Sequence, residues 1–110
     1  MIDEILTAAG VLYQPSRFLR MPDETHAVYF DSITVDGADA VTASAGLPRI
    51  YTHDVTVEVY EPKPDTRAET AIETELDIRG LLWKKQDRYW LSDVQRYQVI
   101  YEFSYTSKTK

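Results

Sequence analysis

The stretch RYQVIYEFSY, residues 96–105, constrains the fold more than any other part of this chain. Every second residue in it is large and apolar or aromatic: Tyr97, Val99, Tyr101, Phe103 and Tyr105. A period of two places these side chains on one face of a β-strand. We therefore expect a long final strand over residues 94–106, with one face packed against the rest of the protein.

Other segments also have the character of strands. Residues 50–60, IYTHDVTVEVY, alternate again, and we expect Val55, Val57 and Val59 on the buried face. Residues 26–30, HAVYF, are rich in residues that favour strands, and residues 81–85 predict one short strand more. Residues 11–20, which contain Pro15, and the connection QDRYWLSD that begins at residue 86 are predicted to be irregular.

Two segments have the period of a helix. Apolar residues fall on one stripe over residues 2–9, and Gly10 follows as a stop signal. Residues 66–79 carry a second stripe, which Gly80 ends. Thr66 and Glu69 have the spacing of a capping box at the start of this second helix.

The order of elements predicts an α+β fold. We expect an antiparallel sheet, with the short N-terminal helix and the longer second helix packed on one face. A length of 110 residues suits one domain over residues 1–110. Residues 36–48, DGADAVTASAGLP, are small and polar, so we expect a long exposed loop of the kind that often carries function.

Composition excludes several classes of protein. The net charge of −6 disfavours nucleic-acid binding through phosphate contacts, which needs clustered Lys and Arg. The absence of cysteine excludes disulfides, thiol nucleophiles and cysteine-based metal sites. Apolar runs are too short to span a bilayer. The first residues lack the pattern of a secretory signal, so we expect synthesis in the cytoplasm.

The residues that usually perform catalysis are sparse. The two histidines, His26 and His53, lie in predicted strands and lack the spacing of metal ligands. Glu69, Glu73 and Asp77 form an acidic stripe on the second helix, which we interpret as a solvated face rather than an acid–base pair. The glycines form no phosphate-binding loop, and the serines lack the context of a hydrolase nucleophile. We therefore expect no enzyme, cofactor or metal.

Aromatic residues are the remaining feature. They are dense near the C-terminus, at Trp83, Tyr89, Trp90, Tyr97, Tyr101 and Tyr105. Tyr and Trp are abundant in cores and are also enriched at protein interfaces. Two interpretations stay open at this point: all these rings belong to the core and the sheet, or some of them form a subunit interface.

The ordered set of segments resembles the small tail-terminator, or tail-completion, proteins of long-tailed phages and prophages. The resemblance rests on AVYFDS at 27–32, the loop from Asp36 to Gly46, DVTVEVYEP at 54–62, the helix that ends at Gly80, LLWKK at 81–85, and RYQVIYEFSY. It spans residues 2–106. The loop departs from the family, because ADAVTASAGLPR is less charged than its usual loop.

The resemblance implies an α+β structural protein of the virion without catalysis or cofactor. Such proteins form a ring, typically of six copies, at the head-proximal end of the tail tube. The ring stops polymerisation of the tube and joins it to the head connector, or stopper, protein. It assembles in the bacterial cytoplasm, DNA passes through its lumen without specific binding, and no membrane is involved.

A closed ring needs two different faces on each subunit that meet each other. One face is expected to involve the aromatic C-terminal region, and the acidic second helix is expected to meet basic residues of a neighbour. The loop is expected to contact the tube or connector. The candidate interface residues are Trp83, Lys84, Lys85, Arg88, Trp90, Tyr105, Asp36, Gly37, Asp39 and Gly46.

Three alternatives stay open from the sequence. The first is another neck component of the same particle, such as a head-completion or connector protein. The second is a binding module or antitoxin-like adaptor unrelated to phages. The third is a hydrolase, which an activity sensitive to His53→Ala would support.

Overall fold

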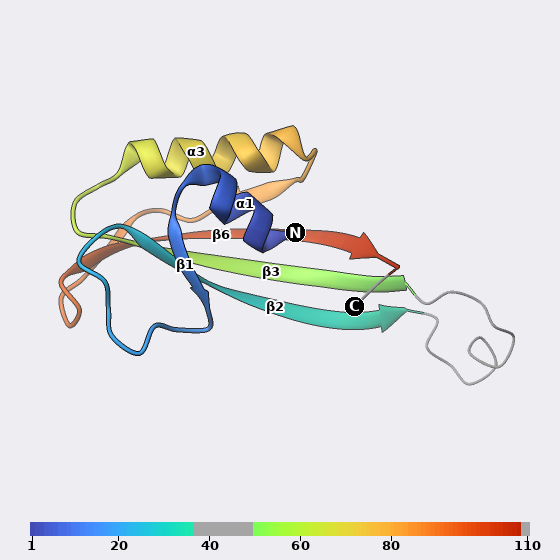
Figure 1. Ribbon diagram of the computed structural model, residues 1–110, viewed down its shortest axis with the longest axis horizontal. Helices are drawn as coiled ribbons and strands as arrows, with labels where there is room; N and C mark the ends of the chain where they lie inside the picture. Colours follow the sequence, from blue (N-terminus) through green and yellow to red (C-terminus); the bar gives the residue numbers. More distant parts are fainter. Residues whose placement is uncertain (37–49, 109–110) are drawn as a thin grey trace, which may run out of the picture.

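The protein, seen in a computed structural model, is described over residues 1–36 and 50–108. Within these residues, two helices and a six-stranded mixed sheet confirm the predicted α+β class (Figure 1). Of the predicted loop, Asp36 ends β2, and residues 37–48, including Gly37, Asp39 and Gly46, lie outside the described residues. The elements are α1 (Ile2–Ala9), β1 (Leu12–Pro15), β2 (His26–Asp36), β3 (Ile50–Glu61), α3 (Thr66–Ile78), β4 (Trp83–Lys85), β5 (Tyr89–Leu91) and β6 (Arg96–Ser107).

Helix α1 has the bounds that the sequence predicted. Gly10 follows it in the left-handed conformation, at φ 73°, and its amide donates to the carbonyl of Thr7. Glycine adopts this conformation without the steric penalty of a Cβ atom. The helix buries Ile2, Ile5 and Leu6.

Helix α3 begins one residue away from the predicted capping box. The N-cap is Asp65, whose Oδ1 accepts from the amide of Ala68 at 3.0 Å, so the predicted pairing of Thr66 with Glu69 is wrong. Asp and Thr are both good N-caps, and the sequence places them next to each other. At the other end, Gly80 has φ 68° and its amide donates to the carbonyl of Asp77, which confirms the predicted stop.

The sheet is mixed, so the prediction of a purely antiparallel sheet is wrong. The strand order is β1-β2-β3-β6-β4, β5 also pairs with β6, and only β1–β2 is parallel among the described pairs. Leu12 lies opposite His26 and Pro15 opposite Tyr29. Residues 16–25 carry the chain back to the end of the sheet where β1 began, so β2 runs in the same direction.

Two strands lie in segments that were predicted to be irregular. β1 interrupts residues 11–20, and β5 lies in the connection after β4. They are 4 and 3 residues long, too short to show a period of two. Each is held by a longer neighbour, β2 or β6, so pairing rather than local propensity decides its conformation.

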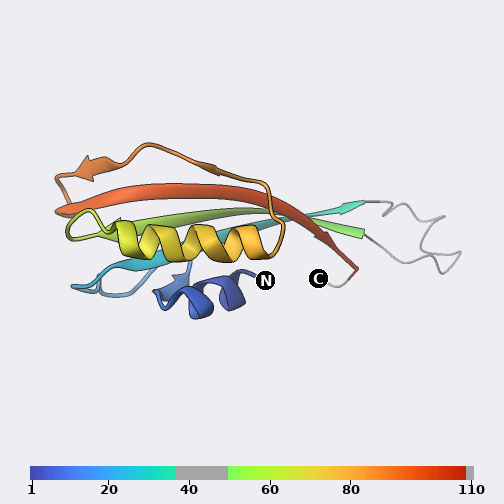
Figure 2. The same ribbon diagram turned by 90° about the horizontal axis from the view of Figure 1, so that it is seen from above.

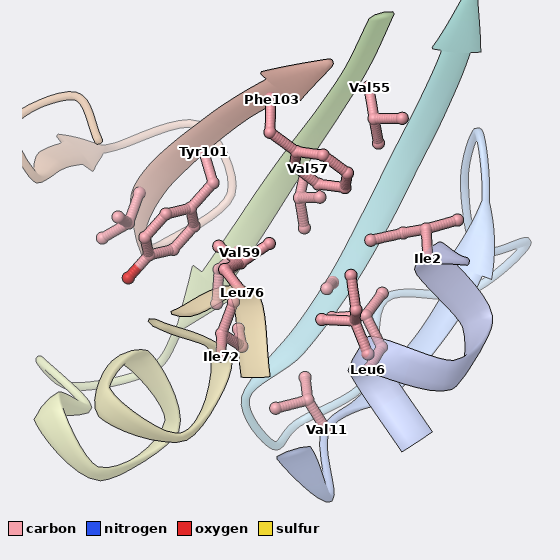
Figure 3. Close-up of a cluster of buried hydrophobic side chains, with 13 residues drawn as sticks. Ile2, Leu6, Val11, Val55, Val57, Val59, Ile72, Leu76, Tyr101 and Phe103 are labelled. Carbon is pink, nitrogen blue, oxygen red and sulfur yellow. The ribbon is translucent and has the colours of Figure 1, made fainter. Parts of the chain in front are cut away.

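The core lies between one face of the sheet and the two helices. Val55, Val57 and Val59 are buried, as predicted, and Val99, Tyr101 and Phe103 on β6 are buried beside them. Figure 3 shows Ile2 and Leu6 of α1 and Ile72 and Leu76 of α3 directed toward these strand residues, and all belong to one buried cluster. The alternation of β6 therefore supplies a large part of the core.

Three strands continue beyond the helices at one end (Figures 1 and 2). β3 is paired along residues 50–60 with β2 on one side and along residues 51–61 with β6 on the other. We call the part formed by residues 30–36 of β2, 50–56 of β3 and 103–107 of β6 the arm. β1 ends opposite Tyr29 and β4 ends opposite Phe103, so the arm begins where these flanking strands stop.

Candidate assembly surface

The segment after helix α3 folds back along that helix and is fixed to it by ion pairs. Lys85 Nζ lies 2.8 Å from Glu69 Oε1 and 2.8 Å from Glu73 Oε2. Trp83 Nε1 donates to Asp77 Oδ1 at 2.9 Å. The acidic stripe thus contacts β4 of its own chain, and its interpretation as a solvated face is wrong for Glu69, which is buried, while Asp77 is exposed.

Arg88 completes this arrangement. Its Nε donates to Glu61 Oε1 at 3.2 Å, and its Nη2 contacts Glu69 Oε2. The side chain of Glu61 is 0% exposed and that of Glu69 is 3% exposed, while Arg88 reaches them from a partly exposed position. Lys85 and Arg88 therefore bind the acidic helix within one chain, where we expected them to bind a neighbour's helix. We call Glu61, Glu69, Glu73, Lys85 and Arg88 the ionic cluster.

The ionic cluster shifts the protonation of its carboxyl groups in opposite directions. Burial, and then the neighbouring carboxylate of Glu69, raises the pKa of Glu61 to about 7. Burial also acts to raise the pKa of Glu69, but its contacts with Glu61, Lys85 and Arg88 outweigh burial and lower that pKa. Glu61 Oε2 is buried and has no hydrogen-bond partner among the described residues. Below about pH 7 the pair therefore holds one proton, on Glu61.

This shared proton makes stability depend on pH. The pKa of Glu61 is about 7 in the folded protein and 4.5 in its ordinary state, so its contribution is complete below pH 4.5 and is lost as pH rises through 7. We expect the free energy of unfolding to fall by about 2–3 kcal/mol between pH 5 and 8 from this group. Urea denaturation across this range measures the change.

The matched variant for this measurement is Glu61→Gln, which keeps the shape and does not titrate. His26 acts in the opposite direction, because burial lowers its pKa and the folded state gains stability as pH rises through the unfolded value. Both the native protein and Glu61→Gln contain His26, so the difference between their pH profiles of unfolding free energy isolates the contribution of Glu61. Parallel pH profiles for the two proteins would contradict the shared proton.

The second polar feature lies in the arm and contains His53. Its Nδ1 lies 3.0 Å from both carboxylate oxygens of Asp31, and its Nε2 lies 3.0 Å from Ser107 Oγ. The ring of Tyr105 stacks on the imidazole at a centroid distance of 4.4 Å. Asp31 lies on β2, His53 on β3 and Ser107 on β6, so this line of polar contacts, the Asp31–His53–Ser107 line, connects the three strands of the arm.

A carboxylate, an imidazole and a hydroxyl in this order also form the site of serine hydrolases. His53 is 3% exposed, and the Tyr105 ring lies against its face. An acyl-transfer site needs, in addition, an open position beside the hydroxyl and donors for the oxyanion. The buried His53 ring is covered by Tyr105, so we interpret the contacts of Asp31, His53 and Ser107 as a structural hydrogen-bond network.

The other histidine lies at the opposite end of the sheet. His26 Nδ1 lies 2.9 Å from the carbonyl oxygen of Glu24, and its ring stacks with Tyr60. Within residues 1–36 and 50–108, no group of three or more His, Cys, Asp or Glu side chains is placed to hold a metal ion.

Exposed apolar side chains gather at both lateral edges of the sheet. On the edge formed by β1 and β2, which we call the β1–β2 edge, Leu12, Phe30 and Ile33 are exposed. On the opposite edge, formed by β4 and β5 and called the β4–β5 edge, the exposed side chains are Leu82, Tyr89 and Trp90. Strand order separates these edges by β3 and β6. The monomer thus exposes apolar side chains at two different edges, with Phe30 and Ile33 on opposite faces of β2.

The predicted interface residues divide between these surfaces and the interior. Trp90 is exposed, with its ring edge-on to Tyr97 at 4.9 Å, and Lys84 is exposed opposite Glu102. Trp83 packs partly buried against the core, and Lys85 and Arg88 belong to the ionic cluster. Tyr105 is half-buried on His53 rather than extended away from the core.

Sequence reasoning missed the apolar residues of the β1–β2 edge. The predicted strand ends at residue 30 and assigns Phe30 to neither face, and Ile33 lies beyond this strand. A usable signal was present, because SITV, residues 32–35, continues the β-branched composition of HAVYFD. Extending that strand would have placed Phe30 and Ile33 on opposite faces.

Comparisons with known proteins leave the family open. A scan against protein-family models finds no matching family, and a search of curated proteins finds no significant match. No helix within the described ranges is long and apolar enough to cross a membrane.

Proposed function

We propose that this protein is a structural component of a phage tail, forming a ring at the head-proximal end of the tail tube. In this role the ring, of six copies, ends polymerisation of the tube and joins the tail to the head connector. The proposal takes the role from the resemblance of the segments over residues 2–106. It takes its physical support from the surfaces of the monomer.

The observation that carries the proposal is the pair of unlike apolar edges. A ring is a heterologous assembly, in which one surface of each subunit meets a different surface of the next. The β1–β2 edge and the β4–β5 edge lie on opposite sides of one sheet, as such an assembly requires. A two-fold dimer would use one surface twice and would leave the other exposed.

The charge of the chain suits passage of DNA. A protein that grips DNA releases counterions by placing Lys and Arg against phosphates. Here the net charge is −6, and Lys85 and Arg88 are neutralised by Glu61, Glu69 and Glu73. A ring of such subunits has little tendency to retain DNA in its lumen.

Trp90 tests the β4–β5 edge. Trp90→Lys is expected to cost only about 1 kcal/mol of unfolding free energy, because the side chain is half-exposed and its main ring contact is Tyr97. In a phage that lacks the native reading frame, however, this variant is expected to leave tails overlong, because a charge replaces an apolar contact between subunits.

The control is Trp90→Phe, which keeps an apolar ring and is expected to restore tails of normal length. Chemical denaturation of both purified variants establishes that they fold. Normal tails with a folded Trp90→Lys variant would remove this edge from the proposed interface.

Two other functions predict different results. Another neck component would leave tail length unchanged when it is deleted, and a binding module unrelated to phages would leave the particles intact. Among the described residues, only the Asp31–His53–Ser107 line has a geometry that supports a hydrolase. An activity lost in His53→Ala would favour it.

A further inference from the structure

The arm has two outer edges that the other strands leave uncovered. On the side of β2 away from β3, the described pairing is with β1 and stops at Tyr29. On the side of β6 away from β3, the described pairing with β5 and β4 stops at Phe103. In the part of the chain that the structure describes, the arm is therefore a three-stranded ribbon whose outer strands continue past their flanking partners.

The direction of the backbone groups on these edges follows from two hydrogen bonds. The carbonyl of Tyr29 accepts from the amide of Ser16, so it points away from β3, and alternation turns the groups of Asp31, Ile33 and Val35 the same way. The carbonyl of Ile100 accepts from the amide of Gln86, so the groups of Ser104 and Thr106 also point outward. Both edges thus offer donors and acceptors to a further strand.

Lys and Pro, two of the devices that usually prevent strand pairing, are absent from both edges, although the β2 edge carries Asp31, which is bonded to His53. Soluble proteins protect such edges with Lys, Pro, bulges or very short strands. Residues 30–36, FDSITVD, contain no Lys or Pro, and neither do residues 104–107, SYTS. Phe30 and Ile33 are exposed on the β2 edge instead. A long edge with exposed apolar residues is a site where another strand pairs.

The free parts of the two edges lie at the same level of the sheet. Phe30 lies opposite Thr56, and Thr56 lies opposite Glu102, so Phe30 and Glu102 lie at one level of the sheet. At that level β6 is still paired with β4, through Lys84 opposite Glu102, so the free part of its edge begins at Ser104, level with Ser32 of β2.

We propose that the arm of one copy pairs with the arm of the next, β2 against β6, so that the sheet continues from subunit to subunit. Ser32 of one copy then lies beside Ser104 of the next, past the point where the pairing of β4 with β6 stops. β2 and β6 are both antiparallel to β3, so they run in the same direction. Copies related by rotation about an axis along the strands therefore join through a parallel pair. This inference rests on the proposed ring and names its contact.

Cysteine pairs test this contact directly, because the chain contains no cysteine. Ser32 and Ser104 both lie opposite Asp54 on β3, so they share one level, on opposite outer strands. Adjacent strands lie about 5 Å apart, which a disulfide or a short bismaleimide spans. Tails are purified from a phage lacking the native reading frame and supplied with Ser32→Cys, Ser104→Cys, a mixture of both chains, or the double variant.

The expected result is specific to a heterologous contact. Each single variant gives no crosslink, the mixture gives covalent dimers, and the double variant gives a ladder up to the closed ring on a non-reducing gel. Lys63→Cys with Ser104→Cys is the matched control, because Lys63 lies in the exposed connection after β3, and it is expected to stay monomeric.

Three results would overturn the inference, and they separate it from the proposed function. Crosslinking of Ser32→Cys alone would mean a two-fold contact of β2 with β2. Protein present in the tails without crosslinks in the double variant would mean that the edges do not meet, while the tail location stands. Protein absent from the tails, detected by immunoblot, would refute the proposed function and the contact together.

Discussion

Replacing Tyr101 with alanine is expected to lower the free energy of unfolding by about 3–5 kcal/mol, the range for large buried aromatic residues. Tyr101 is 0% exposed and packs edge-on against Trp83 at 5.8 Å. Its hydroxyl donates to Glu73 Oε2 at 2.6 Å, which connects β6 to helix α3. The truncation leaves a cavity between sheet and helix and removes this bond. Urea denaturation measures the loss.

Two matched variants separate the parts of this effect. Tyr101→Phe keeps the ring and is expected to cost about 1–1.5 kcal/mol, the value of one hydrogen bond, because Glu73 keeps its ion pair with Lys85. Tyr105→Ala is expected to cost less than Tyr101→Ala, because Tyr105 is only partly buried against the core. Equal losses from Tyr101→Ala and Tyr105→Ala would refute this division of β6.

Replacing Arg88 with alanine is expected to have the second large effect. The variant leaves the buried carboxyl groups of Glu61 and Glu69 without their shared cation. Removing one partner of a buried ion pair costs about 3–5 kcal/mol, and we expect the lower end because the side chain of Arg88 is 29% exposed. The unfolding free energy at pH 8, where Glu61 is ionised, measures the loss.

The control is Arg79→Ala, which breaks the pair with Glu75 one turn away on helix α3. A pair of this kind is worth about 0.3–0.5 kcal/mol, so this variant is expected to remain close to the native stability. The loss in Arg88→Ala is also expected to be smaller at pH 5, where Glu61 carries a proton. If both variants lost the same stability at pH 8, the ionic cluster would have no special role.

The parts of the fold that the sequence predicted are those with a long periodic signal. Val55, Val57 and Val59 alternate with polar residues, as do Val99, Tyr101 and Phe103, and burial follows this pattern. Helix α1 combines an apolar stripe with Gly10, so its bounds are fixed by local chemistry. These elements needed no information about distant residues.

The parts that escaped prediction depend on distant contacts. β1 and β5 exist because β2 and β6 pair with them, and the parallel direction of β1 depends on the path of residues 16–25. An acidic stripe on a helix has the same sequence pattern whether water or cations cover it. Only the fold shows that Lys85 and Arg88 cover Glu69.

The candidate surface was predicted in part for the same reason. Trp90 is exposed and Tyr101 is fully buried, although both are aromatic residues in the same C-terminal region. Composition identifies residues that suit an interface, but their exposure depends on which face of the sheet the helices cover. The apolar β1–β2 edge was missed because Ile33 lay beyond the predicted strand.

The length of the tail tests the central claim most directly. The reading frame is deleted in its source phage, the phage is induced, and particles are imaged by negative-stain electron microscopy. A ring that ends tube polymerisation predicts overlong tails of variable length beside unattached filled heads, with normal length restored by the native chain. Tails of normal length beside tailless heads would place the protein on the connector side, and intact infectious particles would contradict the proposed function.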